Sequence, residues 1–122
     1  MAKSKARSVF TGTWHIVSMS EWDDDYVNEV VQAFIKFERS EFGSFQFGYV
    51  VGSTDPRETT RDGKPAVEFS WEGGDESDGS PFSGRGWAVL EGEELKGMIF
   101  IHGGDDSEFV AKRAVAARGG KD

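Results

Sequence analysis

Large aromatic residues alternate with small or polar residues in two stretches of this chain, and this alternation strongly limits what it can fold into. Side chains on a β-strand point to opposite faces in turn, so residues two apart share a face. In GSFQFGYVV one face would carry Phe45, Phe47, Tyr49 and Val51. In AVEFSW one face would carry Val67, Phe69 and Trp71. The pattern predicts half-buried antiparallel strands.

The same reading along the chain indicates a series of strands joined by glycine-rich turns. Seven segments are expected, at about 11–20, 30–38, 44–54, 65–72, 84–90, 95–102 and 107–115, with at most one short turn of helix within 23–34. Strands with one apolar face must pack as two sheets or close on themselves. We therefore predict an all-β fold: a mostly antiparallel meander of about seven to eight strands, forming a small barrel or a strongly curved sheet.

The length of the chain predicts one domain, and its basic residues are concentrated at the two ends. The 122 residues suit a single β-barrel domain at 9–116, between a basic flexible tail at 1–8 and a flexible tail at 117–122. The net charge is −8, and residues 8–111 hold 21 acidic against 7 basic residues. An acidic body repels phosphate backbones, so no nucleic-acid partner is expected.

The sequence contains no cysteine and no long apolar segment, and both features limit the compartment and the partners that we expect. Cysteine is absent, so there is no disulfide framework and no thiolate site for a metal, which is compatible with a cytoplasmic protein. The start, MAKSKARSVF, has no apolar stretch of signal-peptide length, and no run approaches a membrane span. No cofactor and no membrane association are expected.

Two nearly identical acidic loops, GGDES and GGDDS, raise the question of a metal site. In a meander the strands before them would run in the same direction, so both loops would lie at one rim together with the ERSEFG link. The SEWDDD, STDPRE and LEGEE loops would then lie at the opposite rim.

Carboxylates in these loops offer oxygen ligands of the kind that Ca²⁺ prefers. The candidate metal ligands are Asp75, Asp78, Asp105 and Asp106, with Glu76 and Glu108 beside them. The EF-hand spacing is missing, and Gly-Gly-Asp-x-Ser is also the composition of a turn. We favour solvated turns and expect no metal.

A catalytic reading would have to use a histidine. His15 and His102 both fall in expected strands, on the outer face. His102 with Asp105 or Asp106 could form a proton relay, but no nucleophile accompanies them. An enzyme is the least favoured of the functions considered.

The aromatic residues carry the leading hypothesis. If a barrel interior holds a small apolar or aromatic molecule, its expected lining is Phe47, Tyr49, Phe69, Trp71 and Trp87. A barrel of about eight strands is just wide enough to be filled by side chains or to hold one small ligand. We therefore expect a non-catalytic binding module, with a filled barrel acting through its outer surface as the alternative.

Two expected strands are apolar on both faces, which indicates that something covers their outer side. The outer positions are Val17, Met19, Met98 and Phe100. A symmetric homodimer through these residues is the simplest explanation, and folding of the N-terminal segment over the barrel is the alternative.

The first expected strand, FTGTWHIV, resembles the opening strand of the calycins, the lipocalins and their relatives, in its Gly-x-Trp arrangement of Gly12 and Trp14. The resemblance implies an antiparallel barrel whose end is closed by Trp14, with Arg113 of FVAKR packed over the indole. The WHIVSMSEWDDDYVNE, FGSFQFGYV and GRGWAVL stretches also resemble small bacterial proteins.

Overall fold

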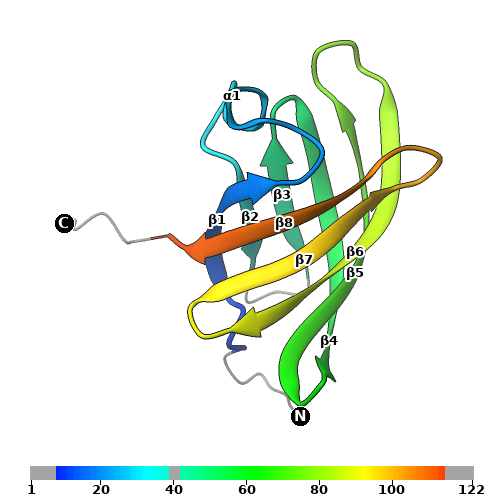
Figure 1. Ribbon diagram of the computed structural model, residues 1–122. Coiled ribbons are helices and arrows are strands. Elements are labelled where there is room, and N and C mark those ends of the chain that lie inside the picture. Colours follow the sequence, from blue (N-terminus) through cyan, green and yellow to red (C-terminus); the bar gives the residue numbers. More distant parts are fainter. Residues whose placement is uncertain (1–7, 39–41, 115–122) are drawn as a thin grey trace.

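The computed structural model describes residues 8–38 and 42–114 and shows eight strands with one short helix (Figure 1). Apart from Ser8, the expected tails at 1–8 and 117–122 lie outside the described residues. The elements, in chain order, are β1 (Gly12–Met19), α1 (Asp24–Val27), β2 (Phe34–Phe37), β3 (Gly43–Phe47), β4 (Val50–Arg61), β5 (Lys64–Asp75), β6 (Pro81–Glu91), β7 (Glu94–Ile101) and β8 (Asp106–Arg113).

The strands form a closed barrel in which each strand pairs with its neighbours in the chain. Every pairing is antiparallel, and β8 returns to pair with β1, where Trp14 lies opposite Arg113. The predicted all-β antiparallel meander is confirmed, and the single helical turn in 23–34 is α1. Within the described residues, no helix is both long and apolar enough to cross a membrane.

The expected strand at 44–54 is two strands, because the chain reverses at Gly48 and Tyr49. Gly48 has φ 56°, and a β-carbon there would lie 2.4 Å from the Tyr26 ring, so the turn accepts only glycine without strain. The prediction that Tyr49 and Val51 share a face with Phe45 was wrong for this reason. Phe45 faces the core, whereas Val51 lies beyond the turn and points outward.

β4 runs through the STDPRE segment, which was wrongly expected to be a loop. The pairing of β3 with β4 ends at Thr54, so beyond that residue β4 has only β5 as its described partner. Pro56 lies in this one-sided stretch, where its missing N–H removes no hydrogen bond from a second neighbour. A two-residue turn at Asp62 and Gly63, both with positive φ, then leads into β5.

The additional strand changes which loops share an end of the barrel. One end, here called the α1 rim, carries the β1–β2 segment with α1, the β3–β4 turn and the two acidic loops at β5–β6 and β7–β8 (Figure 1). The acidic loops therefore share a rim, as predicted. The SEWDDD segment lies at that same rim, whereas Phe37 and Gly43, the ends of β2 and β3 next to the ERSEFG link, lie at the other, which is the reverse of the prediction. The turn in LEGEE lies away from the α1 rim, as expected.

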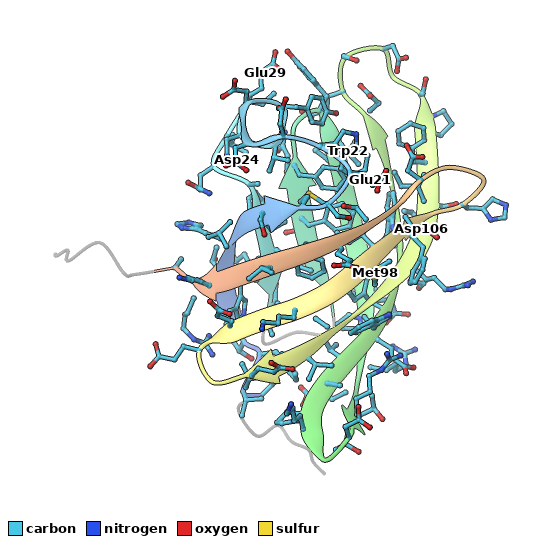
Figure 2. The ribbon with its side chains drawn as sticks, viewed as in Figure 1. Glu21, Trp22, Asp24, Glu29, Met98 and Asp106 are labelled. Carbon is cyan, nitrogen blue, oxygen red and sulfur yellow. The ribbon has the colours of Figure 1, made fainter. Side chains whose placement is uncertain are left out.

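Buried aromatic side chains pack against one another inside the barrel. Rings of Phe45 and Phe47 stack with centroids 5.8 Å apart, and Trp71 meets Phe45 edge-on at 5.0 Å. At the α1 rim, the Trp22 ring lies 5.0 Å from that of Phe47 and packs against the core (Figure 2). All three core rings are at most 1% exposed. The packing matches the expectation that eight strands leave room only for side chains or one small molecule.

Strand β1 contains an irregularity that redirects its last residues. Its pairing with β8 shifts between Ile16 and Ser18, as in a β-bulge, so the inward and outward positions change after Val17. Met19 is consequently buried in the core, whereas Val17 is 44% exposed. The prediction of Met19 as an outer interface residue was wrong for this reason.

Candidate binding face on the outside of the barrel

The five residues expected to line an internal pocket do not surround one space. Phe47, Phe69 and Trp71 are buried core residues. Tyr49 is half-buried in the β3–β4 turn, and its hydroxyl donates to Glu29 Oε2 at 3.0 Å. Trp87 lies on the outer face of β6, so its expected interior position was wrong. A ligand-binding role for these residues stays a prediction.

The hydrogen bond of Tyr49 has an electrostatic consequence. Its acceptor Glu29 stabilises the neutral phenol, both by the hydrogen bond and by its negative charge, and so raises the pKa of Tyr49 above 10.0. The contact ties the β3–β4 turn to the segment that follows α1.

The acidic loops use their carboxylates as local turn acceptors. Asp75 Oδ1 accepts from the amide and hydroxyl of Ser77, and Asp78 Oδ1 accepts from the amide of Ser80 at 2.9 Å. The hydrogen bonds from Ser80 lower the pKa of Asp78. Among the residues that the structure describes, no three His, Cys, Asp or Glu side chains gather as metal ligands would. Asp75 and Asp78 therefore have the geometry of Asx turns.

His102, Asp105 and Asp106 are all exposed in or beside the β7–β8 loop. The backbone amide of His102 donates to the Ser83 carbonyl at 2.7 Å and fixes the loop to β6. Within the described residues, no hydrogen bond or ion pair joins the imidazole to either carboxylate. The three residues are thus neighbours without the contacts of a proton relay.

Two rows of side chains cross the outer face of β4 to β8, as the strand register requires. Residues directly opposite one another on neighbouring strands form each row. The first row reads Arg57, Glu68, Trp87, Met98 and Glu108 from β4 to β8. The second row lies two residues further along each strand. It reads Asp55, Ser70, Arg85, Phe100 and Asp106 from β4 to β8.

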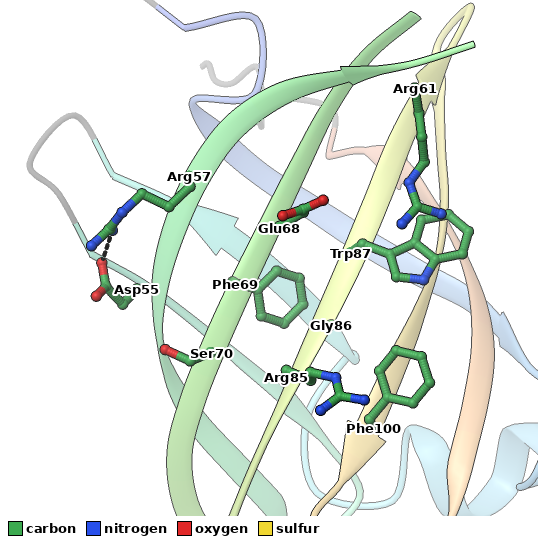
Figure 3. Close-up of a pocket in the computed structure, with 10 residues that line it drawn as sticks. All are labelled: Asp55, Arg57, Arg61, Glu68, Phe69, Ser70, Arg85, Gly86, Trp87 and Phe100. Carbon is green, nitrogen blue, oxygen red and sulfur yellow. Dashed lines mark hydrogen bonds and ion pairs between the residues drawn. The ribbon is translucent and has the colours of Figure 1, made fainter.

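Arginine side chains cover the aromatic rings of both rows (Figure 3). The guanidinium carbon of Arg61 lies 4.0 Å from the centroid of the Trp87 ring, and that of Arg85 lies 5.3 Å from the centroid of Phe100. Each such contact stabilises by about 0.5–2 kcal/mol, depending on exposure. The contacts also hold two positive charges against apolar surface.

A hollow of about 480 Å³ lies over these rows. Its lining brings together three arginines, two carboxylates and three aromatic rings (Figure 3): Asp55, Arg57, Arg61, Glu68, Phe69, Ser70, Arg85, Gly86, Trp87 and Phe100. Three positive groups against two negative ones is an unusual balance in a chain of net charge −8. We call the outward-pointing residues Arg57, Arg61, Glu68, Arg85, Trp87, Met98 and Phe100 the arginine–aromatic face.

Two lysines form ion pairs with one glutamate at the end of this face that lies away from the α1 rim. Lys64 and Lys96 both lie near the Glu91 carboxylate, at 3.3 and 3.5 Å. Their charges, with the hydrogen bond from Lys64 as the largest contribution, lower the pKa of Glu91. Because the three residues come from β5, β6 and β7, the cluster ties together the strands that carry the hollow.

The arginine–aromatic face was largely missed from the sequence, although Met98 and Phe100 were placed correctly on the outer face. The signal for Trp87 was present in GRGWA, where Gly84, Gly86 and Ala88 alternate with Arg85 and Trp87. A β-carbon on Gly86 would lie 2.5 Å from the Phe69 ring, so the small residues are the inward ones. Trp87 must then point outward.

Comparison with models of known protein families, with curated proteins and with solved structures found no match to this chain. The class of protein is accordingly defined by geometry: a closed, eight-stranded antiparallel barrel with an aromatic-rich core.

Proposed function

We propose that this protein is a non-catalytic interaction module that binds a macromolecular partner through its arginine–aromatic face. The observation that carries this proposal is the pair of stacks, Arg61 on Trp87 and Arg85 on Phe100, in one hollow. Tryptophan and arginine dominate the binding energy of many protein interfaces, and methionine and phenylalanine are enriched there too.

Packing inside the barrel favours this function over an internal ligand site. The Phe45 ring packs against the rings of Phe47 and Trp71 within the core. Outside, the same fold leaves Trp87, Met98 and Phe100 only partly covered. These three side chains still have apolar surface exposed to water. A partner that covers this surface gains free energy from its burial, whereas the buried core residues have little surface left to bury.

A second candidate retains a small aromatic molecule as ligand, but moves it to the outer hollow. The volume of about 480 Å³ is within the usual range for small-molecule sites, and Trp87 supplies a ring to stack on. Thermal unfolding with 2-naphthoate and its neutral amide tests this directly. Stabilisation that disappears in Trp87→Ala would support it, and an unchanged melting temperature with both compounds would reject these probes as ligands.

The family and compartment are also part of the proposal. The closed antiparallel barrel and the position of Arg113 over Trp14 support a relationship to the calycins. Within that group, this chain would bind its partner through the outer face of the barrel and not in the interior. The lack of cysteine supports a cytoplasmic location.

Site-specific photo-crosslinking in cells that naturally express the protein tests the interaction function. Ser70 and Ser18 are both exposed serines on barrel strands, but only Ser70 lies in the hollow. With benzoylphenylalanine at each position in turn, we expect crosslinked adducts from position 70 and few from position 18. Equal yields, or none from position 70, would contradict the proposal.

A further inference from the structure

The chain contains two Asp–Gly pairs, Asp62–Gly63 and Asp78–Gly79, and both lie in exposed turns between strands. Glycine has no side chain to shield its backbone nitrogen, so that nitrogen can attack the carboxyl of the preceding aspartate. We propose that Asp62 is a modification site, at which the folded protein converts aspartate spontaneously to isoaspartate, and that hydrogen bonds protect Asp78 from the same reaction. This chemistry does not depend on what the arginine–aromatic face binds.

The reaction has two steps and needs only water. First, the Gly63 nitrogen loses its proton and forms a bond to Cγ of the protonated Asp62 carboxyl, whose hydroxyl leaves as water, and a five-membered succinimide results. Water then adds to one of the two ring carbonyls, and the bond from that carbon to the nitrogen breaks. Opening at Cγ restores aspartate, whereas opening at the main-chain carbonyl gives isoaspartate. One water leaves and one is added, so the mass of the chain is unchanged.

The Asp62–Gly63 pair is free to react. In the part of the chain that the structure describes, no hydrogen bond or ion pair engages the Asp62 carboxylate or the Gly63 amide. Both residues are exposed, and a β-carbon added to Gly63 would meet nothing within 4 Å. An exposed turn tip of this kind opens locally at little cost in free energy, so the Gly63 nitrogen can swing towards Cγ.

The Asp78–Gly79 pair is held at both reacting groups. The Gly79 amide donates to the Asp75 carbonyl at 2.8 Å, and Asp78 Oδ1 accepts from the Ser80 amide at 2.9 Å. The hydrogen bonds from Ser80 also lower the pKa of Asp78, so its carboxyl less often carries the hydroxyl that must leave. Free space does not distinguish the two pairs, because a β-carbon on Gly79 would also meet nothing within 4 Å. Hydrogen bonding is the difference between them.

Isoaspartate at position 62 would lengthen the main chain by one atom within the turn that joins Arg61 to Lys64. A two-residue turn is matched to the twist of its paired strands, so the added atom displaces the residues that flank it. The guanidinium carbon of Arg61 lies 4.0 Å from the centroid of the Trp87 ring, and Lys64 Nζ lies 3.3 Å from Glu91 Oε2. The modification therefore acts on one end of the arginine–aromatic face.

Ageing of the full chain in mildly acidic buffer, followed by peptide mapping, tests the inference. An aspartate-specific endoproteinase cuts before aspartate but not before isoaspartate, so the uncut peptides measure the product at positions 62 and 78. In the folded chain we expect isoaspartate to form at position 62 at least roughly tenfold faster than at position 78, because reaction at 78 must first break hydrogen bonds. In urea the two rates should converge, because unfolding removes the protection of Asp78.

Two variants at position 62 provide matched controls. Asparagine tolerates positive φ and cyclises more readily because ammonia leaves, so Asp62→Asn should accumulate isoaspartate faster than the wild-type chain. Asp62→Glu keeps the charge but would have to close a six-membered ring, so product at this position should disappear. Circular dichroism of the fresh variants shows whether each is folded. Equal rates at the two positions in the folded chain, a faster rate at position 78, or product at position 62 only in urea would each overturn the inference.

Discussion

The guanidinium carbon of Arg113 lies 4.0 Å from the centroid of the Trp14 ring and joins the last strand of the barrel to the first. Arg113 also donates to the carbonyls of Thr11 and Val9, at 2.9 and 2.8 Å. The Trp14 indole N–H donates to the Phe10 carbonyl at 2.9 Å. One side chain thus covers the buried indole and satisfies the backbone that precedes β1.

Arg113→Ala should lower the free energy of unfolding by about 2 kcal/mol, because it removes a ring contact and two charge-assisted hydrogen bonds. Arg113→Lys should restore less than half of the loss, since an ammonium lacks the planar fork that reaches both carbonyls. Urea denaturation measures both values. Lys112→Ala, at the exposed neighbouring position, should change stability by no more than about 0.5 kcal/mol, and an equal effect of the two alanines would contradict the capping role.

Gly52→Ala should destabilise the barrel by about 2–3 kcal/mol through overpacking. A β-carbon at position 52 would lie 2.5 Å from the Phe45 ring and 3.0 Å from that of Trp71, with no backbone among the nearest atoms. Because the clash is with side chains, adding Phe45→Leu should recover part of the loss, so the two substitutions should be non-additive in denaturation experiments. Strictly additive losses would show that the rings do not require glycine at this position.

Replacing Met19 or Val17 by lysine should show which of these two β1 side chains points into the core. Met19→Lys puts an ammonium into the core and should cost more than about 3 kcal/mol, whereas Val17→Lys should change stability by less than about 0.5 kcal/mol. Thermal unfolding of the two variants makes the comparison. A larger effect at Val17 would mean that the strand lacks its irregularity after Ile16.

The pKa of Tyr49 should depend on Glu29. With Tyr26→Phe as background, Tyr49 is the remaining tyrosine, and its absorbance should titrate above the ordinary value of 10.0. Glu29→Gln removes the charge and should shift the titration down. The contact stabilises the folded chain fully below the unfolded pKa of Tyr49, and its contribution is lost as pH rises through the raised folded pKa. An unchanged titration in Glu29→Gln would contradict this account.

Alternation in the sequence was enough to predict strands, an antiparallel meander and most of the core, because one apolar face per strand has few ways to be buried. It could not show which face of FSGRGWAVL is inside. Trp87 is larger than its neighbours Gly86 and Ala88, yet the interior beside Phe69 has no room for a β-carbon at position 86. Size alone therefore gave the wrong direction for Trp87.

The remaining errors have a common cause in local backbone reversals. Gly48 turns the chain within an apolar run whose two sides look like one continuous strand, and the irregularity after Ile16 changes the side on which Met19 lies. Each of these two backbone changes involves only one or two residues, so it leaves little trace in the alternation of the sequence. The arginine–aromatic face depends in addition on the register between strands, which the sequence of one strand does not contain.

Closure of β8 onto β1 makes the sheet cyclic, so no strand is structurally first or last. Trp14, near the start of β1, lies opposite Arg113, at the end of β8, and the two-residue turn at Gly92 and Glu93 lies on that same side of the barrel. A circular permutant that joins β8 to β1 by a short linker and opens between those two turn residues would retain every strand pairing. In this barrel, the order of the strands around the ring matters more than the point at which synthesis begins.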